Sequence, residues 1–208
     1  MPKLLLATNN AGKVAELRQI LDGCGWELVT PADAGLDMEV GETGQGYAEN
    51  ATIKAVAFAQ ASGLTALADD SGIEVDALDG RPGALSARYA GPNRTDAERV
   101  AKLIEELRDV PDERRTARFR CVIAIASPQG EVDLVEGTVE GRIAREPRGE
   151  NGFGYDPAFL LPERGLTMAE LPPDEKHAVS HRGAAARAAR KVLEKMLRGA
   201  GFSPPETG

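Results

Sequence analysis

The amino-terminal stretch "KLLLATNNAGKVAELRQIL" constrains the fold more than any other part of the chain. An apolar run over residues 3–7 predicts a buried strand, and apolar residues at helical spacing from Gly12 to Leu21 predict a helix directly after it. Strand and helix patterns keep alternating up to residue 107, whereas residues 118–143 contain only strand patterns. This order favours an α/β fold with a mixed central sheet flanked by helices.

Start and stop signals place the remaining elements. Gly63 is expected to end an Ala-rich helix over residues 47–61, Thr95 begins a capping box, and Ser180 is expected to cap a last helix that runs to about Leu197. Strands are expected at 27–29, 64–68, 73–75, 118–126, 131–135 and 138–143. We expect a single domain over residues 1–198 and a frayed tail over 199–208.

Composition excludes several classes of protein. The formal net charge is −8 and the pI is near 5.0, which argues against a protein that coats nucleic acid. A local group of Lys and Arg can still bind a small anion. No apolar run approaches the length of a membrane span, and Cys24 and Cys121 form neither a disulfide framework nor a CxxC metal site. These features predict a cytoplasmic protein with no membrane or nucleic-acid partner.

The turn "ATNNAGK" resembles a phosphate-binding loop without being a Walker loop, because Ala7 and Val14 stand where Gly and a hydroxyl residue are required. Lys13 lies in the first turn of the predicted helix, where free N–H groups and the helix dipole favour an anion. The alternative is that Asn10 and its neighbours simply cap the helix.

Two adjacent carboxylates, Asp69 and Asp70, follow the apolar run "ALA" at the predicted carboxyl end of a strand. Ligand crevices of α/β sheets form at such ends. Because side chains alternate along a strand, one carboxylate could face a metal ion while the other anchors the loop. The alternative is a turn in which Asp and Ser bond to their own backbone. Glu42 adds a third carboxylate on a separate loop.

Two later segments carry side chains suited to a nucleotide base. Phe153 and Tyr155 lie in the glycine-rich "GENGFGYDP", in a chain that is only 4% aromatic, and a ring on a loop is a usual platform for stacking a base. Such rings can equally pack the loop onto the core. The segment "DEKHAVSHRG" brings Lys176, His181 and Arg182 together as donors to a carbonyl oxygen or a phosphate.

Taken in order, "ATNNAGK", "ENATIKA", "ADDSGIEVDALDGRPGALSARYAG", "GENGFGYDP" and "SHRG" resemble the signature of the inosine/xanthosine triphosphate pyrophosphatase family, from Lys3 to about Leu197. The resemblance implies hydrolysis of ITP, dITP and XTP between the α- and β-phosphates, with Mg²⁺ as cofactor. It also implies two lobes with the active-site cleft between them, and a homodimer.

The resemblance also implies a role for each matching residue. Asp70 would be the catalytic carboxylate and would hold the metal together with Glu42, while Ser71 would contact the substrate. Phosphate contacts would come from Thr8, Asn9, Asn10, Ala11, Gly12, Lys13 and Lys54. The base pocket would be formed by Phe153, Gly154, Tyr155, Asp156, Lys176, His181 and Arg182. The family usually reads "GTGGFGYDP", so Glu150 and Asn151 depart from its pattern and raise a question about the flexibility of the loop.

Two alternative functions stay open. One is a nucleotide pyrophosphatase with another base preference, as in the Maf-like enzymes, although the "FGYD" and "SHR" segments argue against it. The other is a nucleotide-binding module without catalysis, which the intact Asp70, Lys13 and Glu42 disfavour. A pyrophosphate-release assay discriminates among the three functions.

Overall fold

The structure, a computed structural model, describes residues 1–201 of the chain. It has an α/β fold with a mixed seven-stranded sheet in the order β2-β1-β3-β4-β5-β6-β7. Strand β1 pairs in parallel with β2 and β3, whereas the pairs β5–β6 and β6–β7 are antiparallel. The predicted fold class is therefore confirmed.

The elements have the following bounds. The strands are β1 (Lys3–Leu6), β2 (Glu27–Val29), β3 (Thr65–Val75), β4 (Thr116–Ala126), β5 (Val132–Ile143), β6 (Phe159–Leu161) and β7 (Leu166–Thr167). The α-helices are α1 (Ala11–Ile20), α2 (Tyr47–Ser62), α3 (Asp96–Glu106), α4 (Pro173–Val179) and α5 (His181–Gly199). Short 3₁₀ helices are η1 (Asp76–Leu78), η2 (Gly83–Arg88), η3 (Asp112–Arg114), η4 (Asp156–Ala158) and η5 (Met168–Glu170).

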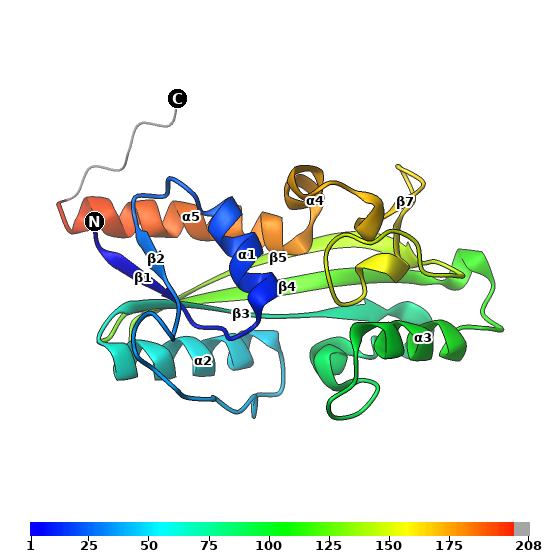
Figure 1. Ribbon diagram of the computed structural model, residues 1–208, viewed down its shortest axis with the longest axis horizontal. Helices are drawn as coiled ribbons and strands as arrows, with labels where there is room; N and C mark the ends of the chain where they lie inside the picture. Colours follow the sequence, from blue (N-terminus) through cyan, green and yellow to red (C-terminus); the bar gives the residue numbers. More distant parts are fainter. Residues whose placement is uncertain (202–208) are drawn as a thin grey trace. The chain divides into compact units, whose positions relative to one another are not determined.

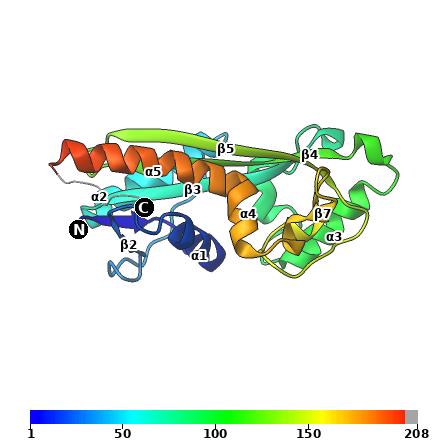
Figure 2. The same ribbon diagram turned by 90° about the horizontal axis from the view of Figure 1, so that it is seen from above.

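The described chain divides into two compact units, of which the first comprises residues 1–70, 121–137 and 184–201. In this unit α1 and α5 cover one face of the strands and α2 covers the other (Figures 1 and 2). Leu4 and Leu6 are fully buried in one cluster with Leu17 of α1 and Leu193 of α5. Leu5, which is also fully buried, is outside that cluster, as the alternation of side chains along β1 requires.

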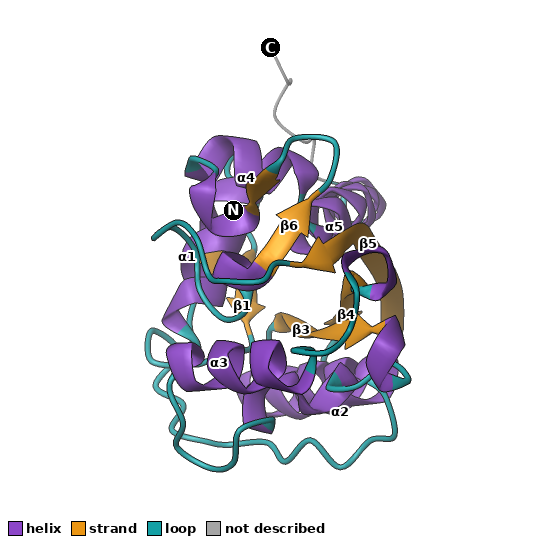
Figure 3. Ribbon diagram, turned by 90° about the vertical axis from the view of Figure 1, so that its right-hand side faces the viewer, coloured by secondary structure: helices purple, strands orange, loops and turns teal. Residues whose placement is uncertain are grey.

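The second unit comprises residues 71–120 and 138–183. Here α3 lies on one side of the strands and α4 on the other (Figure 3). Its core includes Ile73 of β3, Leu103 of α3, Phe119 of β4 and Phe159 of β6. A core of its own allows this unit to hold the loops between its strands in fixed positions.

Two pairs of predicted strands are in fact single strands. The predicted strands 64–68 and 73–75 form the continuous β3, so the "DDSG" segment lies inside a strand and not in the turn considered for it. The predicted strands 131–135 and 138–143 likewise form the single strand β5. Both predictions were wrong for one reason, since pairing with long neighbouring strands overrides the local turn preference of Gly, Asp and Ser.

The predicted helix ends are confirmed. Gly63 follows α2 in the left-handed conformation at φ 69°, and Thr95 and Glu98 form a reciprocal capping box at α3. The Ser180 hydroxyl accepts a hydrogen bond from the Gly183 N–H at the start of α5. Most of the predicted tail, 202–208, lies outside the described residues. Within residues 1–201, no helix combines the length and apolar character needed to cross a membrane.

Candidate active site

The turn after β1 delivers the amino end of α1 to the carboxyl edge of the parallel strands. Asn10 caps the helix by accepting from the Lys13 N–H at 3.1 Å, and the Asn10 N–H donates to Thr8 Oγ1 at 3.2 Å. Ala11 and Gly12 occupy the first turn, where a helix leaves its N–H groups without intrahelical acceptors. The turn thus caps the helix and also has the form of an anion-binding helix start.

Lys13 reaches from this turn to β3. Its Nζ atom lies 2.9 Å from Asp69 Oδ2 and 3.5 Å from the Asp69 carbonyl oxygen. Asp69 is only 1% exposed, and the Cys121 thiol lies 3.9 Å from the same carboxylate oxygen. Asp69 therefore fixes the position of a lysine whose ammonium group is close to the helix start.

Asp70 faces a different set of partners, supplied by α2 and the loop before it. Its Oδ2 atom accepts from Asn50 Nδ2 at 3.0 Å, and its Oδ1 atom lies 3.8 Å from Lys54 Nζ. The same ammonium group is 3.0 Å from Glu42 Oε1 and 2.8 Å from the Asp69 carbonyl oxygen. The two adjacent carboxylates thus have different partners: Asp69 contacts Lys13, whereas Asp70 and Glu42 converge on Lys54.

Strand register places these carboxylates at the carboxyl end of β1 although they lie inside β3. Leu6, the last residue of β1, is in register with Leu67 of β3, and the last backbone bond of this pair runs from the Ala7 N–H to the Leu67 carbonyl at 2.8 Å. Asp69 and Asp70 therefore extend beyond the end of β1. The strand predicted to end before them continues to Val75, so only the neighbouring β1 ends at this level.

Burial raises the pKa of the Asp70 carboxyl group, and the nearby Glu42 carboxylate acts in the same direction. The Lys54 charge and the Asn50 hydrogen bond oppose this effect and lower the pKa. A carboxylate whose pKa is raised is a better acceptor for a proton from water. The environment of Asp70 is thus suited to a general base.

Glu42 and Asp70 also fit a hard divalent cation. Two carboxylates from different elements already point at one cationic atom, the Lys54 Nζ. Within residues 1–201, no group of three or more His, Cys, Asp or Glu side chains has the arrangement of a complete metal site. Mg²⁺ commonly takes one or two protein carboxylates and completes its shell with phosphate oxygens and water. Two carboxylates alone would thus suit a cation that takes its remaining ligands from a phosphate group and water.

In the second unit, Phe153 is the centre of a separate cluster. Lys176 Nζ lies 5.0 Å and Arg182 Cζ lies 5.3 Å from the centroid of its ring, so two cations contact one aromatic group. Arg182 is 3% exposed and donates from Nη2 to Ser71 Oγ at 2.8 Å. The ring is thus a platform flanked by charged donors.

A buried ion pair holds the loop that carries this ring. Asp156 Oδ2 accepts from Lys176 Nζ at 2.5 Å and from the Phe153 N–H at 2.9 Å. Gly152 lies against the pair with φ +76°, and a Cβ atom there would stand 2.1 Å from Asp156 Oδ2. Only glycine permits both the left-handed backbone and this close approach.

Further contacts tie the same loop to its surroundings. The Gly154 N–H donates to Asp96 Oδ2 at 2.7 Å, and the Tyr155 hydroxyl donates to the Ser86 carbonyl at 2.8 Å. Asn151 donates from Nδ2 to the Leu171 carbonyl at 3.0 Å. Asn151, which departs from the family pattern, therefore anchors the loop. Tyr155 is 5% exposed, so of the two rings only Phe153 remains suited to stacking.

His181 has a ring partner of its own. It stacks on Phe119 with centroids 4.6 Å apart and planes at 14°, and Phe119 also contacts Phe159 at 4.3 Å. The stack fixes the plane of the imidazole at the start of α5.

Each unit thus collects its own share of the predicted residues. The first unit brings Lys13, Lys54, Glu42 and Asp70 together, and the second brings together Ser71, Phe153, Asp156, Lys176 and Arg182. Asn9 is exposed, and its side chain makes no hydrogen bond or ion pair within residues 1–201.

Sequence reasoning missed two contributors. Asn50, the partner of Asp70, stands four residues before Lys54 on one face of α2, and this spacing could have indicated it. Phe119, the partner of His181, lies in the middle of β4 and has no signal that separates it from other core residues.

Comparison with known proteins identifies the family to which the chain is similar. Residues 4–192 match the model of the Ham1 family. The chain is 51% identical over 194 residues to a dITP/XTP pyrophosphatase of Desulforamulus reducens, covering 93% of this chain and 96% of the relative. It is 47% identical to a dITP/XTP pyrophosphatase of Bacillus subtilis, covering 93% of this chain and 98% of the relative.

A solved structure shows the same fold. The HAM1 protein of Coxiella burnetii superposes with a TM-score of 0.85 at 44% identity, over 94% of this chain and 100% of that one. The family match spans most of the chain, and the relatives are matched over nearly their whole length. The chain therefore belongs to the Ham1 family.

Proposed function

We propose that this protein is a Mg²⁺-dependent nucleoside triphosphate pyrophosphatase that hydrolyses ITP, dITP and XTP to the monophosphate and pyrophosphate. The observation that carries the proposal is the convergence of Asp70 and Glu42 on Lys54 Nζ, which contacts the same Asp69 carbonyl oxygen as Lys13 Nζ. The similarity to two dITP/XTP pyrophosphatases supports the reaction and the substrates.

The first unit would bind the triphosphate and activate water. Lys13 and Lys54 neutralise phosphate charge, and the N–H groups at the start of α1 donate to phosphate oxygens. Asp70 accepts a proton from the attacking water at a carboxylate oxygen, for which its raised pKa suits it. Mg²⁺, held by Glu42 and Asp70, would supply charge neutralisation on the leaving pyrophosphate.

The second unit would recognise the base. Phe153 stacks on the purine, and Arg182 and His181 offer N–H donors. Hypoxanthine and xanthine have an oxygen acceptor at C6, where adenine has an amino donor. A buried donor that faces adenine would be left without an acceptor, at a cost of about 1–3 kcal/mol per group. Donors at this place therefore select 6-keto purines.

The test is pyrophosphate release from ITP, XTP, dITP, GTP and ATP, each with Mg²⁺ and with EDTA. The proposal requires rapid release from ITP, XTP and dITP, slow release from ATP, and loss of release in EDTA. Preference for another base would favour the Maf-like alternative, and tight nucleotide binding without release would indicate a module without catalysis. We further propose that the protein acts in the cytoplasm and that it forms a homodimer. Sedimentation of the purified protein would test the homodimer.

Replacing Lys13 tests the phosphate role. Lys13→Ala should weaken ITP binding and turnover together, because its charge meets the phosphates in both the ground state and the transition state. Because the side chain contacts Asp69 in the first unit, ITP and GTP should lose kcat/KM by similar factors. Steady-state kinetics on both substrates measure this, with exposed Lys3→Ala as the matched control. A loss that depends strongly on the base would move Lys13 to another role.

A further inference from the structure

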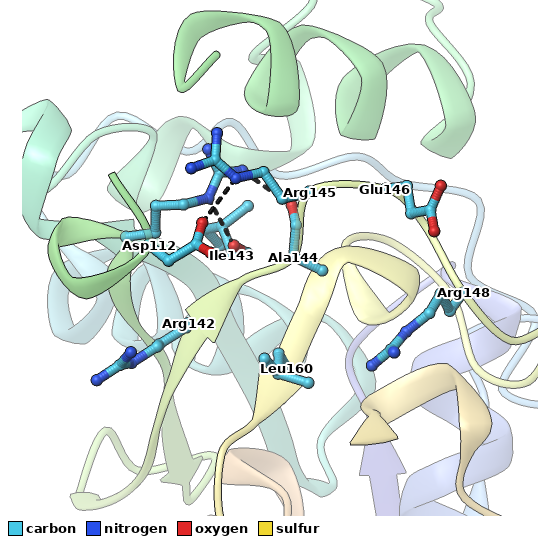
Figure 4. A pocket seen from close by; sticks show the side chains of 9 residues that line it. Asp112, Arg142, Ile143, Ala144, Arg145, Glu146, Arg148 and Leu160 are labelled. Carbon is cyan, nitrogen blue, oxygen red and sulfur yellow. Dashed lines mark hydrogen bonds and ion pairs between the residues drawn. The ribbon is translucent and has the colours of Figure 1, made fainter. Parts of the chain in front are cut away.

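Four arginines of the second unit line a pocket that contains none of the residues assigned above to the substrate. The pocket has a volume of about 360 Å³ and is shown from close by in Figure 4. This volume lies at the lower end of the range for small-molecule sites. Its charged lining consists of Arg115, Arg142, Arg145, Arg148, Asp112 and Glu146.

The charge of this pocket is opposite to that of the chain. Four guanidinium groups stand with two carboxylates, whereas the whole chain has a formal net charge of −8. In Figure 4, Arg142 and Arg148 lie on either side of Leu160, and the Glu146 side chain points away from that residue. A concave surface with a net positive charge concentrates anions.

Arg115 forms the wall of the pocket and is 1% exposed. Its nitrogens donate to three backbone carbonyls, those of Ile143 at 2.8 Å, Leu107 at 2.5 Å and Ala144 at 2.9 Å. No carboxylate forms an ion pair with it among residues 1–201. Burial lowers the pKa of Arg115 and the nearby charge of Arg145 adds to the effect, while the Asp112 carboxylate, which forms no ion pair with Arg115, opposes it. A buried cation without a paired anion is unfavourable, so an anion bound here would offset that cost.

The other arginines differ in how far they are engaged. Arg145 is held by Asp112 at 2.6 Å, and Arg148 donates to the Gly165 carbonyl at 3.1 Å and lies 3.4 Å from Glu170. The side chain of Arg142 makes no hydrogen bond or ion pair within the described part of the chain. Arg142 is therefore available to a ligand without giving up a protein partner. Protein contacts hold Arg145 and Arg148 in position.

We propose that this pocket binds a diphosphate group, carried by inorganic pyrophosphate or by a nucleoside diphosphate. A guanidinium binds two phosphate oxygens at once, and several guanidiniums around one cavity match an ion with several charged oxygens better than a monoanion. The proposal does not rest on the function proposed above, because it uses other residues.

The test is a titration of metal-free protein, ¹⁵N-labelled at arginine, with inorganic pyrophosphate, ADP or orthophosphate at constant ionic strength. Saturable shifts of the Nε–H signals of Arg115 and Arg142 are expected with pyrophosphate, ADP or both, and which ligand acts identifies the source of the diphosphate. Single Arg→Gln variants assign the signals. Because the readout is local, binding at the triphosphate cluster of the first unit does not interfere.

A charge-matched pair of variants completes the test. Arg142→Gln/Arg145→Gln should raise the Kd for the diphosphate at least about tenfold, measured on the Arg115 signal, since two charge-assisted contacts are lost. Arg18→Gln/Arg198→Gln removes the same charge from the first unit and should leave that Kd unchanged. Shifts that do not saturate, equal shifts with orthophosphate, or equal losses in both double variants would overturn the proposal.

Discussion

Asp70→Asn should lower turnover of ITP by about 10²–10⁴-fold, the range associated with loss of a general base, while the protein stays folded and still binds nucleotide. Asparagine keeps the shape of the side chain and can still accept the hydrogen bond from Asn50. It removes the charge that holds the metal and takes the proton. Single-turnover release of pyrophosphate measures the effect on chemistry alone.

The raised pKa of Asp70 adds an independent check. A carboxyl group whose folded-state pKa lies above the unfolded value stabilises the fold below the unfolded pKa and loses that contribution as pH rises through the folded pKa. At neutral pH the ionised group is therefore a cost to stability. The Tm of Asp70→Asn should match or exceed that of the parent, with the exposed Asp22→Asn as a neutral control. Near-parental turnover in Asp70→Asn would refute the catalytic assignment. A large decrease in Tm would mean that the loss of turnover results from unfolding and not from loss of the general base.

The fold was predictable wherever a local signal decides the structure. Asn10, Gly63 and Thr95 end or begin their helices as expected, because capping uses side chains within a few residues of the helix end. The continuity of β3 through Gly72 and of β5 through Gly137 was not predictable in this way. Those residues favour turns locally, and long-range pairing with neighbouring strands outweighs that preference.

The candidate site shows the same division. The motifs identified Lys13, Asp70 and Lys54, and the structure shows that Lys54 connects Asp70 with Glu42, which spacing alone could not establish. In the second unit, the contact between Asp156 and Lys176 joins residues twenty positions apart in the chain. Contacts of this kind depend on tertiary packing. The sequence therefore identifies candidate side chains but does not predict which of them are in contact.

Arg182→Ala should lower the ratio of kcat/KM for ITP over ATP by about tenfold to a few hundredfold, as expected for losing one or two charge-assisted hydrogen bonds to the C6 oxygen. The rate on ATP should change little, because adenine has no acceptor at that position. Steady-state kinetics on both substrates give the ratio. Arg182→Lys retains a charge but lacks the planar fork, and it should recover only part of the selectivity.

Phe153→Ala separates base selectivity from stacking. Stacking does not distinguish the exocyclic groups of purines, so this variant should lose kcat/KM on ITP and ATP by similar factors. The comparison matters because Arg182 also contacts the Phe153 ring, at 5.3 Å from its centroid. If Arg182 served only to hold that ring, Arg182→Ala would behave like Phe153→Ala and lower both substrates alike. A selective loss on ITP in Arg182→Ala, with an unselective loss in Phe153→Ala, would assign the C6 contact to the guanidinium itself.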